Sequence, residues 1–453
     1  MAGRYMPLDK PLRVGATIAL MTAGSLLGPN LVHAGAPGYE IQLGVAESDN
    51  IQRLPSGARD ETIGYEELGF TWHEKRPSLD ADIDADISHL SYLQHTYDDE
   101  VIGNFIGQAR VNLVPQLLTW ETFDNFGQNR LNPLSPITPG NRENVNYFGT
   151  GPELSLPLGR ETRLDLTGQY GRVDYQKSPL NSTRLTGGVG LVHELSPLSS
   201  ISLNVREDRI NFANDQLNHD YDRQEAFARF DTNGSRTKIG FDLGYSRLDL
   251  LGAHQGSVLA RLDVSRRVSA SSTVGLAIGH DYSDGADAFR LVQSLGGATL
   301  NTQSTVQSGA PLISNYATLL WNFQHVRTTL SLSASYFHDR YQTAPGFDND
   351  RDVLNATLAR QITPSLQLAL TEYALRQQFI SADVSATETN TGLQLNWHAG
   401  RSLTVLAAYY LAKSSSDIPA SVYTENRVWI GIGYGRAAEV PPGPAPLKLP
   451  GRY

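Results

Sequence analysis

Hydrophobic and polar residues alternate with a period of two along most of the chain. The clearest example is the segment 79–87, LDADIDADI, in which every odd-numbered residue is apolar and every even-numbered residue is Asp. Successive side chains of a strand point to opposite faces, whereas a helix would distribute these carboxylates around its axis. The same separation recurs in the segments 201–206, 238–245, 330–336 and 428–434. The pattern therefore predicts an all-β protein.

Connections of two lengths alternate between the predicted strands. Longer polar segments include residues 174–183, 211–222, 283–312, 342–350 and 414–424. Tight turns at one end and long loops at the other are typical of outer-membrane β-barrels. The tight turns are expected near residues 76–77, 114–115, 157–161, 196–198, 233–235, 268–271, 325–327, 363–364 and 399–401.

Nine short turns join eighteen strands, and further strands near 39–46 and 427–434 bring the number to twenty. We therefore expect a transmembrane antiparallel up-and-down β-barrel of 18–20 strands. A β-propeller also repeats hairpins, but its blades are buried on both faces, where rows of Asp and Arg would lack water. The longest loop contains a candidate short helix at 286–295, which either folds into the barrel as a constriction or lies over its outer surface.

Charged residues on the strands are expected to face the inside of the barrel. An Asp row facing lipid would cost several kcal/mol, whereas the inner face of a barrel can be wet. If the lumen is open, rows of opposite charge create a transverse field across the water; if it is closed, the same residues form ion pairs that fill it. The predicted lumen-lining residues are Asp80, Asp82, Asp84, Asp86, Arg110, Arg163, Asp165, Arg206, Asp242, Arg261 and Asp263.

Aromatic residues near the predicted strand ends are expected to form girdles at the two membrane interfaces. These residues are Tyr170, Tyr245, Trp321, Tyr336, Trp397, Tyr409 and Trp429.

Composition removes several classes of protein. The 453 residues include no Cys, which excludes disulfide scaffolds, zinc ribbons, iron–sulfur clusters and thiol nucleophiles. The formal net charge of −10 argues against a nucleic-acid partner. Residues 1–34 combine early basic residues with a short apolar core, so we expect a signal peptide cleaved after Ala34. The barrel is then expected over residues 35–436, followed by a Pro-rich periplasmic tail at 437–453.

Several segments also resemble a known family. They are GVAESDNIQR (44–53), LDADIDADISHLSYLQHTYDDEV (79–101), TFDNFGQNRLNPLSPITPGNRENVNYFGTGPEL (122–154), HELSPLSSISLNV (193–205) and DYDRQEAFARF (220–230). These segments are similar to the outer-membrane β-barrels associated with exosortase or PEP-CTERM systems, which are related to the β-barrel porin type 2 proteins. The resemblance implies a bacterial outer-membrane barrel that accompanies exopolysaccharide biosynthesis and protein sorting. It implies no activity or substrate.

Candidate chemistry is sparse, and we expect no catalytic residues, no metal site and no cofactor. His-Asp pairs occur at 219–220, 280–281 and 338–339, but no Ser-centred motif or repeated metal-ligand spacing accompanies them. Carboxylates at 281, 284 and 287, and at 348, 350 and 352, could gather around Ca²⁺, although neither set matches an EF-hand. The Gly-rich segment 431–435 lies in a strand with no following helix, which excludes a phosphate-binding loop.

Two functions of different classes remain. The first is a porin-like pore or conduit for polar solutes or polymer, associated with exopolysaccharide export and the exosortase system. The alternative is a non-conducting structural or anchoring barrel that binds surface polysaccharide or proteins through its long outer loops. Neither is an enzyme. The expected partners are outer-membrane lipid and lipopolysaccharide, exopolysaccharide and the barrel assembly machinery, and the expected location is the bacterial outer membrane.

Overall fold

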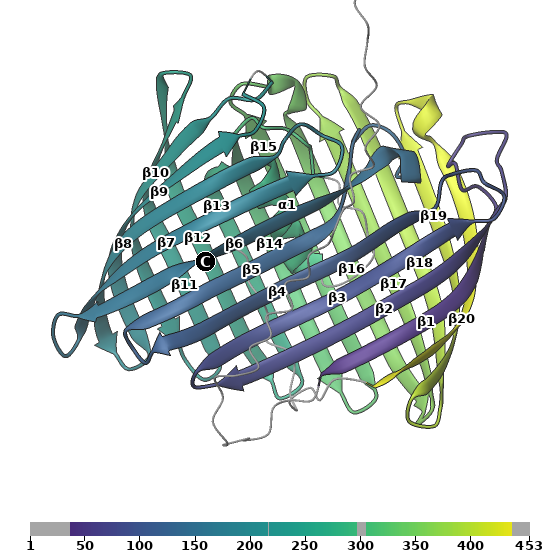
Figure 1. Ribbon diagram of the computed structural model, residues 1–453, viewed down its shortest axis with the longest axis horizontal. Helices are drawn as coiled ribbons and strands as arrows, with labels where there is room; N and C mark the ends of the chain where they lie inside the picture. Colours follow the sequence, from purple (N-terminus) through teal and green to yellow (C-terminus); the bar gives the residue numbers. More distant parts are fainter. Residues whose placement is uncertain (1–36, 216, 297–304, 437–453) are drawn as a thin grey trace, which may run out of the picture. The chain divides into compact units, whose positions relative to one another are not determined.

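A computed structural model describes residues 37–215, 217–296 and 305–436. These residues form one antiparallel sheet of 20 strands (Figure 1). The first ten strands are β1 Gly38–Ser48, β2 Glu61–Arg76, β3 Leu79–Tyr92, β4 Glu100–Val114, β5 Leu118–Arg130, β6 Arg142–Pro157, β7 Thr162–Tyr175, β8 Ser182–Ser196, β9 Ser199–Phe212 and β10 Tyr221–Asn233. The next ten are β11 Thr237–Leu250, β12 Ala253–Ser269, β13 Ser272–Ser283, β14 Leu312–His325, β15 Thr328–Tyr341, β16 Asn349–Thr363, β17 Leu366–Phe379, β18 Val384–Ala399, β19 Leu403–Ser416 and β20 Tyr423–Arg436.

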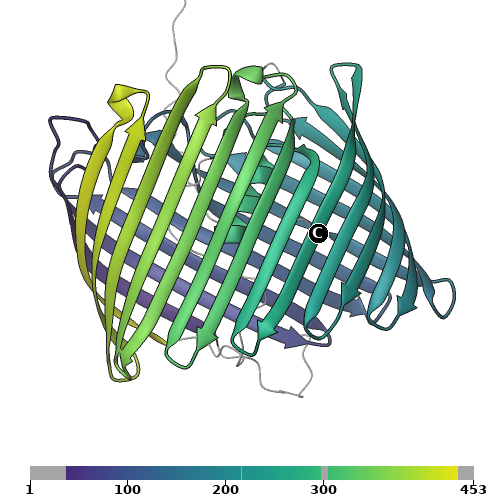
Figure 2. The same ribbon diagram turned by 180° about the vertical axis from the view of Figure 1, so that it is seen from behind.

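The sheet closes on itself because its first and last strands pair. Each strand pairs with the next one along the chain, and β1 also pairs with β20, from Tyr39 opposite Arg436 to Ser48 opposite Arg427. The two opposite views show the strands crossing obliquely on the near and far walls (Figures 1 and 2). Closure gives every strand two neighbours, as a sheet in lipid requires. The expected class, an antiparallel barrel of 18–20 strands, is confirmed, and the number of strands is twenty.

Connection lengths alternate as the sequence predicts. All nine expected short turns join strands at one end of the barrel, and the five longer polar segments lie in connections at the other end. Three connections at this end contain single 3-10 turns, η1 Pro139–Asn141, η2 Pro345–Phe347 and η3 Pro419–Ser421. One connection at the long-loop end is short. Leu251 and Gly252 link β11 to β12 with positive φ angles of 54° and 76°, which a two-residue hairpin turn requires.

The outer face of the barrel is apolar over most strands. On β8 and β9, for example, Leu185, Val189, Leu203 and Val205 are 50–65% exposed. Six of the seven expected girdle residues are also exposed, which fits the outer face. For Trp429 the expectation is wrong, because its ring packs edge to face with Tyr65 on the inner wall and lines a cavity there.

One α-helix follows β13, namely α1 Gly285–Gly296. It lies inside the barrel, where Ala286 and Phe289 are buried in a cluster with Phe123, Tyr147 and Val173 from β5, β6 and β7 (Figure 1). This placement decides between the two sequence alternatives in favour of the inward one. Among the residues that the structure describes, no helix has the length and apolar character to cross a membrane. The expected signal peptide and Pro-rich tail lie outside the described residues.

Candidate functional site

The strand registers place all eleven predicted lumen residues on the inner face of the wall. Contacts with α1 identify this face, because Arg184 of β8 and Arg223 of β10 both reach Asp287 of the helix. Alternation along each strand and pairing across strands then extend the assignment. Arg223 is opposite Asp208, for example, and Asp242 is opposite Arg261. Whether these residues line an open passage is a separate question, and it depends on what fills the lumen.

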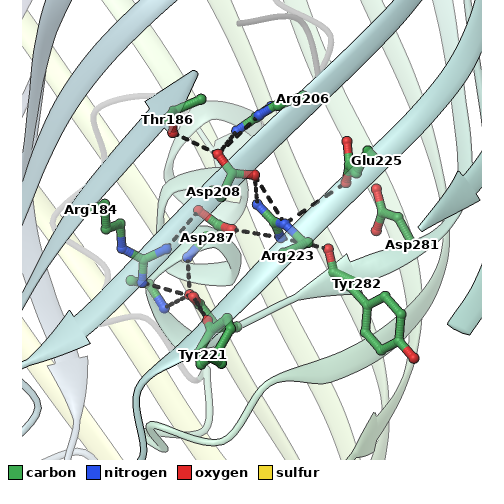
Figure 3. A network of polar contacts seen from close by, with 12 residues as sticks. Arg184, Thr186, Arg206, Asp208, Tyr221, Arg223, Glu225, Asp281, Tyr282 and Asp287 are labelled. Atoms are coloured by element: carbon green, nitrogen blue, oxygen red, sulfur yellow. Dashed lines mark hydrogen bonds and ion pairs between the residues drawn. The ribbon is translucent and has the colours of Figure 1, made fainter. Parts of the chain in front are cut away.

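Ion pairs cover the inner wall of β7 to β13. Figure 3 shows those around Asp208 and Asp287. The Asp208 carboxylate forms ion pairs with Arg206 at 2.9 Å and with Arg223 at 3.0 Å. Arg261 contacts Glu225 at 3.2 Å and Asp281 at 2.5 Å. The remaining predicted residues are also paired here, since Arg229 holds Asp242 at 2.7 Å and Arg163 holds Asp165 at 3.1 Å. Asp263 likewise has an interaction partner. This half of the lumen therefore has the closed arrangement.

Asp284 fixes the start of α1 to this wall. Its Oδ1 accepts hydrogen bonds from the backbone N–H groups of Ala286 and Asp287, both at 2.9 Å, which is the geometry of a helix N-cap. Its Oδ2 receives the Arg184 guanidinium at 2.8 Å and a hydrogen bond from the Tyr221 hydroxyl. One carboxylate thus both begins the helix and attaches it to β8 and β10.

Asp287 and Arg290 add further attachment points one turn into the helix. The Asp287 carboxylate lies 3.4 Å from both Arg184 and Arg223. Burial alone would raise the pKa of Asp287, but these guanidinium groups and Arg290 hold that pKa below its usual value of 3.8. The Arg290 guanidinium lies over the rings of Phe123 at 4.8 Å and Tyr147 at 5.1 Å. The helix is therefore held by charge as well as by apolar packing.

Most of the carboxylates considered for calcium contact other groups of the protein instead. Asp281 pairs with Arg261, Asp284 with Arg184, and Asp287 with Arg184 and Arg223. In the second set, Asp350 lies 2.6 Å from His338 Nδ1, and Asp348 accepts the Tyr341 N–H at 2.8 Å. Guanidinium groups beside the first set disfavour a divalent cation there.

Two of the His-Asp pairs are divided between the faces of the wall. Asp281 points inward to Arg261, whereas His280 bonds to Asn315 and Ser257 on the opposite side. His338 contacts Asp350, while Asp339 binds Ser314 and Arg351. Adjacent strand residues cannot share one site because their side chains alternate.

Carboxylates dominate the inner wall of β1 to β3. Asp80, Asp82, Asp84 and Asp86 lie there with Glu40 and Glu67. The basic side chains on the same face of these strands are Lys75 and His73. His73 Nδ1 lies 2.6 Å from Asp82, and His73 Nε2 lies 3.9 Å from Asp84. Ligand atoms of His73, Asp82 and Asp84 fall within 4.8 Å of one another, so these three could hold a metal ion. Arg110 lies at the margin, where it pairs with Glu121 at 3.1 Å.

A cavity of about 500 Å³ opens beside this acidic wall. It extends from β16 through β20 and β1 to β3, on the side of the lumen away from the ion-pair network. Its walls combine amides and hydroxyls with carboxylates, aromatic rings and the guanidinium groups of Arg53, Arg142 and Arg427. The sequence reasoning named only one of its lining residues, Asp86, as a lumen residue. Those it missed include Gln42, Tyr65, Glu67, Asn355, Thr357, Thr371, Tyr373, Asn390, Gln394, Tyr410 and Trp429. Alternate positions of a strand share one face, so counting along each strand from the predicted lumen residues would have placed these side chains on the inner face.

The closed strand order, the apolar outer face and the charged inner face define a transmembrane β-barrel. No family model matches this chain, and no curated protein matches it.

Solved structures with a similar fold include two receptors and an iron transporter. A ferric enterobactin receptor mutant from Pseudomonas aeruginosa has 10% identity and a TM-score of 0.44, with 89% of this chain and 81% of that chain covered. A siderophore receptor from Acinetobacter baumannii has 9% identity and a TM-score of 0.44, with 88% of this chain and 80% of that chain covered. An iron transporter from Neisseria meningitidis has 8% identity and a TM-score of 0.42, with 89% of this chain and 82% of that chain covered.

Proposed function

We propose that the protein is a conduit for polar solutes across the bacterial outer membrane, with a preference for cations. The observation that carries this proposal is the unequal lumen, in which one half holds a cavity beside a wall rich in carboxylates. Barrels of roughly 16–18 strands leave an aqueous channel, so twenty strands leave room for a passage beside an inward helix. Fixed negative charge along a passage concentrates cations and repels anions.

The alternative, a non-conducting anchoring barrel, draws support from the other half. There α1 and the Arg–Asp pairs occupy the space in front of β7 to β13. A barrel whose whole lumen were filled in this way would carry no solute. The inner faces of β1 to β3 carry no arginine, and the arginines that line the cavity, Arg53, Arg142 and Arg427, pair with Glu425 and Glu100 instead of holding an inward helix. This difference favours the conduit.

Polymer as cargo, and an association with exopolysaccharide export and the exosortase system, are part of the same proposal. Their support is the family resemblance of the sequence. The cavity wall from β16 to β18 is compatible with a hydroxyl-rich chain, because it presents uncharged amides and hydroxyls such as Asn355, Thr371 and Gln394.

Single-channel recording tests the conduit. The protein without residues 1–34 is refolded into a planar bilayer, and the reversal potential is measured in a salt gradient. The variant D80N/D82N/D84N/D86N should keep conducting and lose cation preference severalfold, because it removes the charge but keeps the side-chain volumes.

A matched control removes four carboxylates from the outer face. E66Q/D174N/E207Q/D222N changes the charge by the same amount at side chains that are 34–69% exposed, and its selectivity should equal that of the unmodified protein. Folding of each variant is checked by heat-modifiable gel migration. A folded protein that gives a silent bilayer would support the anchoring barrel, and equal selectivity in both variants would contradict a role for the Asp ladder.

A further inference from the structure

Glycines clear a recess in the inner wall around Trp429. A Cβ atom placed on Gly44 would lie 3.2 Å from Cε2 of the indole, and one placed on Gly431 would lie 3.0 Å from its Cη2. The indole therefore lies directly over these two glycines, which face it from β1 and β20. Larger residues at either position would push the ring away from the wall. The Gly-rich segment 431–435 thus shapes a surface inside the barrel.

Tyr65 completes an aromatic corner in this recess. Its ring centroid lies 5.6 Å from that of Trp429 with the planes at 88°, so the two rings meet edge to face. Both residues line the cavity, and Tyr410 from β19 lines it beside them. An edge-to-face pair fixes the orientation of both rings, which favours a preformed surface.

Carboxylates adjoin the aromatic corner. Glu67 lies two residues after Tyr65 on the same strand face, and the Ser88 hydroxyl donates to it at 3.1 Å. Asp86 and Glu67 both line the cavity. Gly69 leaves space between them and Glu40, since a Cβ atom there would lie 3.2 Å from Asp86 Oδ1 and 3.7 Å from Glu40 Cβ. Two carboxyl groups therefore lie together beside the aromatic corner.

The cations that line the cavity are already paired. Arg53 binds Glu425 at 2.8 Å, Arg427 binds the same carboxylate at 2.5 Å, and Arg142 binds Glu100. Within the described ranges, no ion pair of 4.0 Å or less involves Glu67 or Asp86. The recess therefore offers carboxylates and aromatic faces to a cation that comes from outside the chain.

We propose that this recess binds an organic cation, with its positive group between Glu67 and Asp86 and its apolar part against Trp429 and Tyr65. The inference deepens the proposed function and rests on it for the route by which the solute arrives. The two carboxylates attract the positive group, and the aromatic rings contact the apolar part. An anion would be repelled by both carboxylates, and a neutral solute would gain only the aromatic contact.

Three probes of one shape separate these cases. Benzylamine is cationic, benzyl alcohol is neutral and benzoate is anionic at neutral pH. Each is titrated against the refolded protein in two ways, by block of single-channel current and by quenching of tryptophan fluorescence. Trp429 is the reporter, and W429F identifies its share of the signal. Benzylamine should act at concentrations about tenfold lower than benzyl alcohol, and benzoate should have no effect.

Variants assign the effect to the recess. E67Q/D86N should remove the preference for benzylamine over benzyl alcohol while leaving the response to benzyl alcohol. The matched control is E66Q, which neutralises the neighbouring residue on the outer face of the same strand and should leave the preference intact.

Equal action of benzylamine and benzyl alcohol would overturn the proposal in favour of a site for neutral solutes, and an unchanged preference in E67Q/D86N would also overturn it. The two proposals fail separately. A conducting barrel that no probe blocks or quenches contradicts only the recess, whereas a silent barrel with benzylamine-dependent quenching contradicts only the conduit.

Discussion

At the scale of the residue, Asp284 performs two tasks with one carboxylate. It caps the first turn of α1 and pairs with Arg184, whose side chain is only 8% exposed. Removal of one partner from a buried ion pair is more costly than absence of the whole pair, because the other charge remains buried. The stability of the inner helix therefore depends strongly on this position.

We expect Asp284→Ala to destabilise the protein by about 3–5 kcal/mol, since it combines a lost N-cap with an uncompensated guanidinium. Asp284→Asn should cost less, because the amide oxygen still caps the helix. The measurement is the denaturant dependence of heat-modifiable gel migration. Asp215→Ala, at an exposed loop carboxylate, is the control and should behave like the unmodified protein. Equal midpoints for D284A and D215A would contradict the anchoring role.

Residue faces were predictable from the sequence wherever the period of two was unbroken. The positions of Asp80 and Arg261 follow from alternation alone, because a one-residue shift would turn every side chain to the other face. The prediction for Trp429 was wrong because it followed the residue type and not this alternation. Its residue type suggested a membrane interface, whereas its parity with Gly431 and Gly433 places it inside. Parity is the stronger evidence because it follows from strand geometry.

At the scale of the element, α1 was predictable as a helix but its direction was not. The composition of 286–295 favours a helix, yet the residues that hold it inside the barrel lie far away in the sequence. Arg184 is 103 positions from Asp287, and Tyr147 is 140 positions from it. Only the closed sheet brings these groups together. The cavity beside β1 was missed for the same reason, because its walls come from both ends of the chain.

Replacement of α1 by a Gly-Ser segment of equal length should enlarge the passage. Current per channel should rise, roughly doubling if the freed half of the lumen conducts as the acidic half does. Cation preference should fall, because Arg184 and Arg223 would then face water. The control is a Gly-Ser replacement of residues 343–347, an outer connection. An unchanged current after replacement of α1 would show that the helix does not restrict the passage.

At the scale of the whole molecule, closure rests on the contact between β1 and β20. This contact is continuous from Tyr39 to Ser48 and includes a side-chain bond between Ser48 and Glu425. The sequence indicated both strands and their even number, and closure followed from the need of a sheet in lipid to pair every strand. The register of the two strands is information that only the structure supplies.

Glu47 and Val428 are opposite each other at this contact and test the register. Antiparallel partners have Cα atoms ~4.5–5.5 Å apart, which suits a disulfide. Because the chain has no Cys, the double variant E47C/V428C should form one intramolecular cross-link without competition. The oxidised form should resist heat-induced unfolding on gels, and a reductant should abolish the resistance. The single variants E47C and V428C should show neither effect, and failure of the double variant to cross-link would contradict the register.

The same contact sets the order in which the molecule can be made. Ser48 and Glu425 are 377 positions apart, so β1 cannot pair with β20 until nearly the whole chain has been synthesised. Until then both margins of the sheet carry unsatisfied backbone groups, which can pair with any other strand. Closing so long a loop is slow, and slow closure allows incorrect strand pairing between chains. Newly synthesised chains are therefore most vulnerable to one another at the moment before closure, and a peptide that copies either margin would act as a decoy for the missing strand.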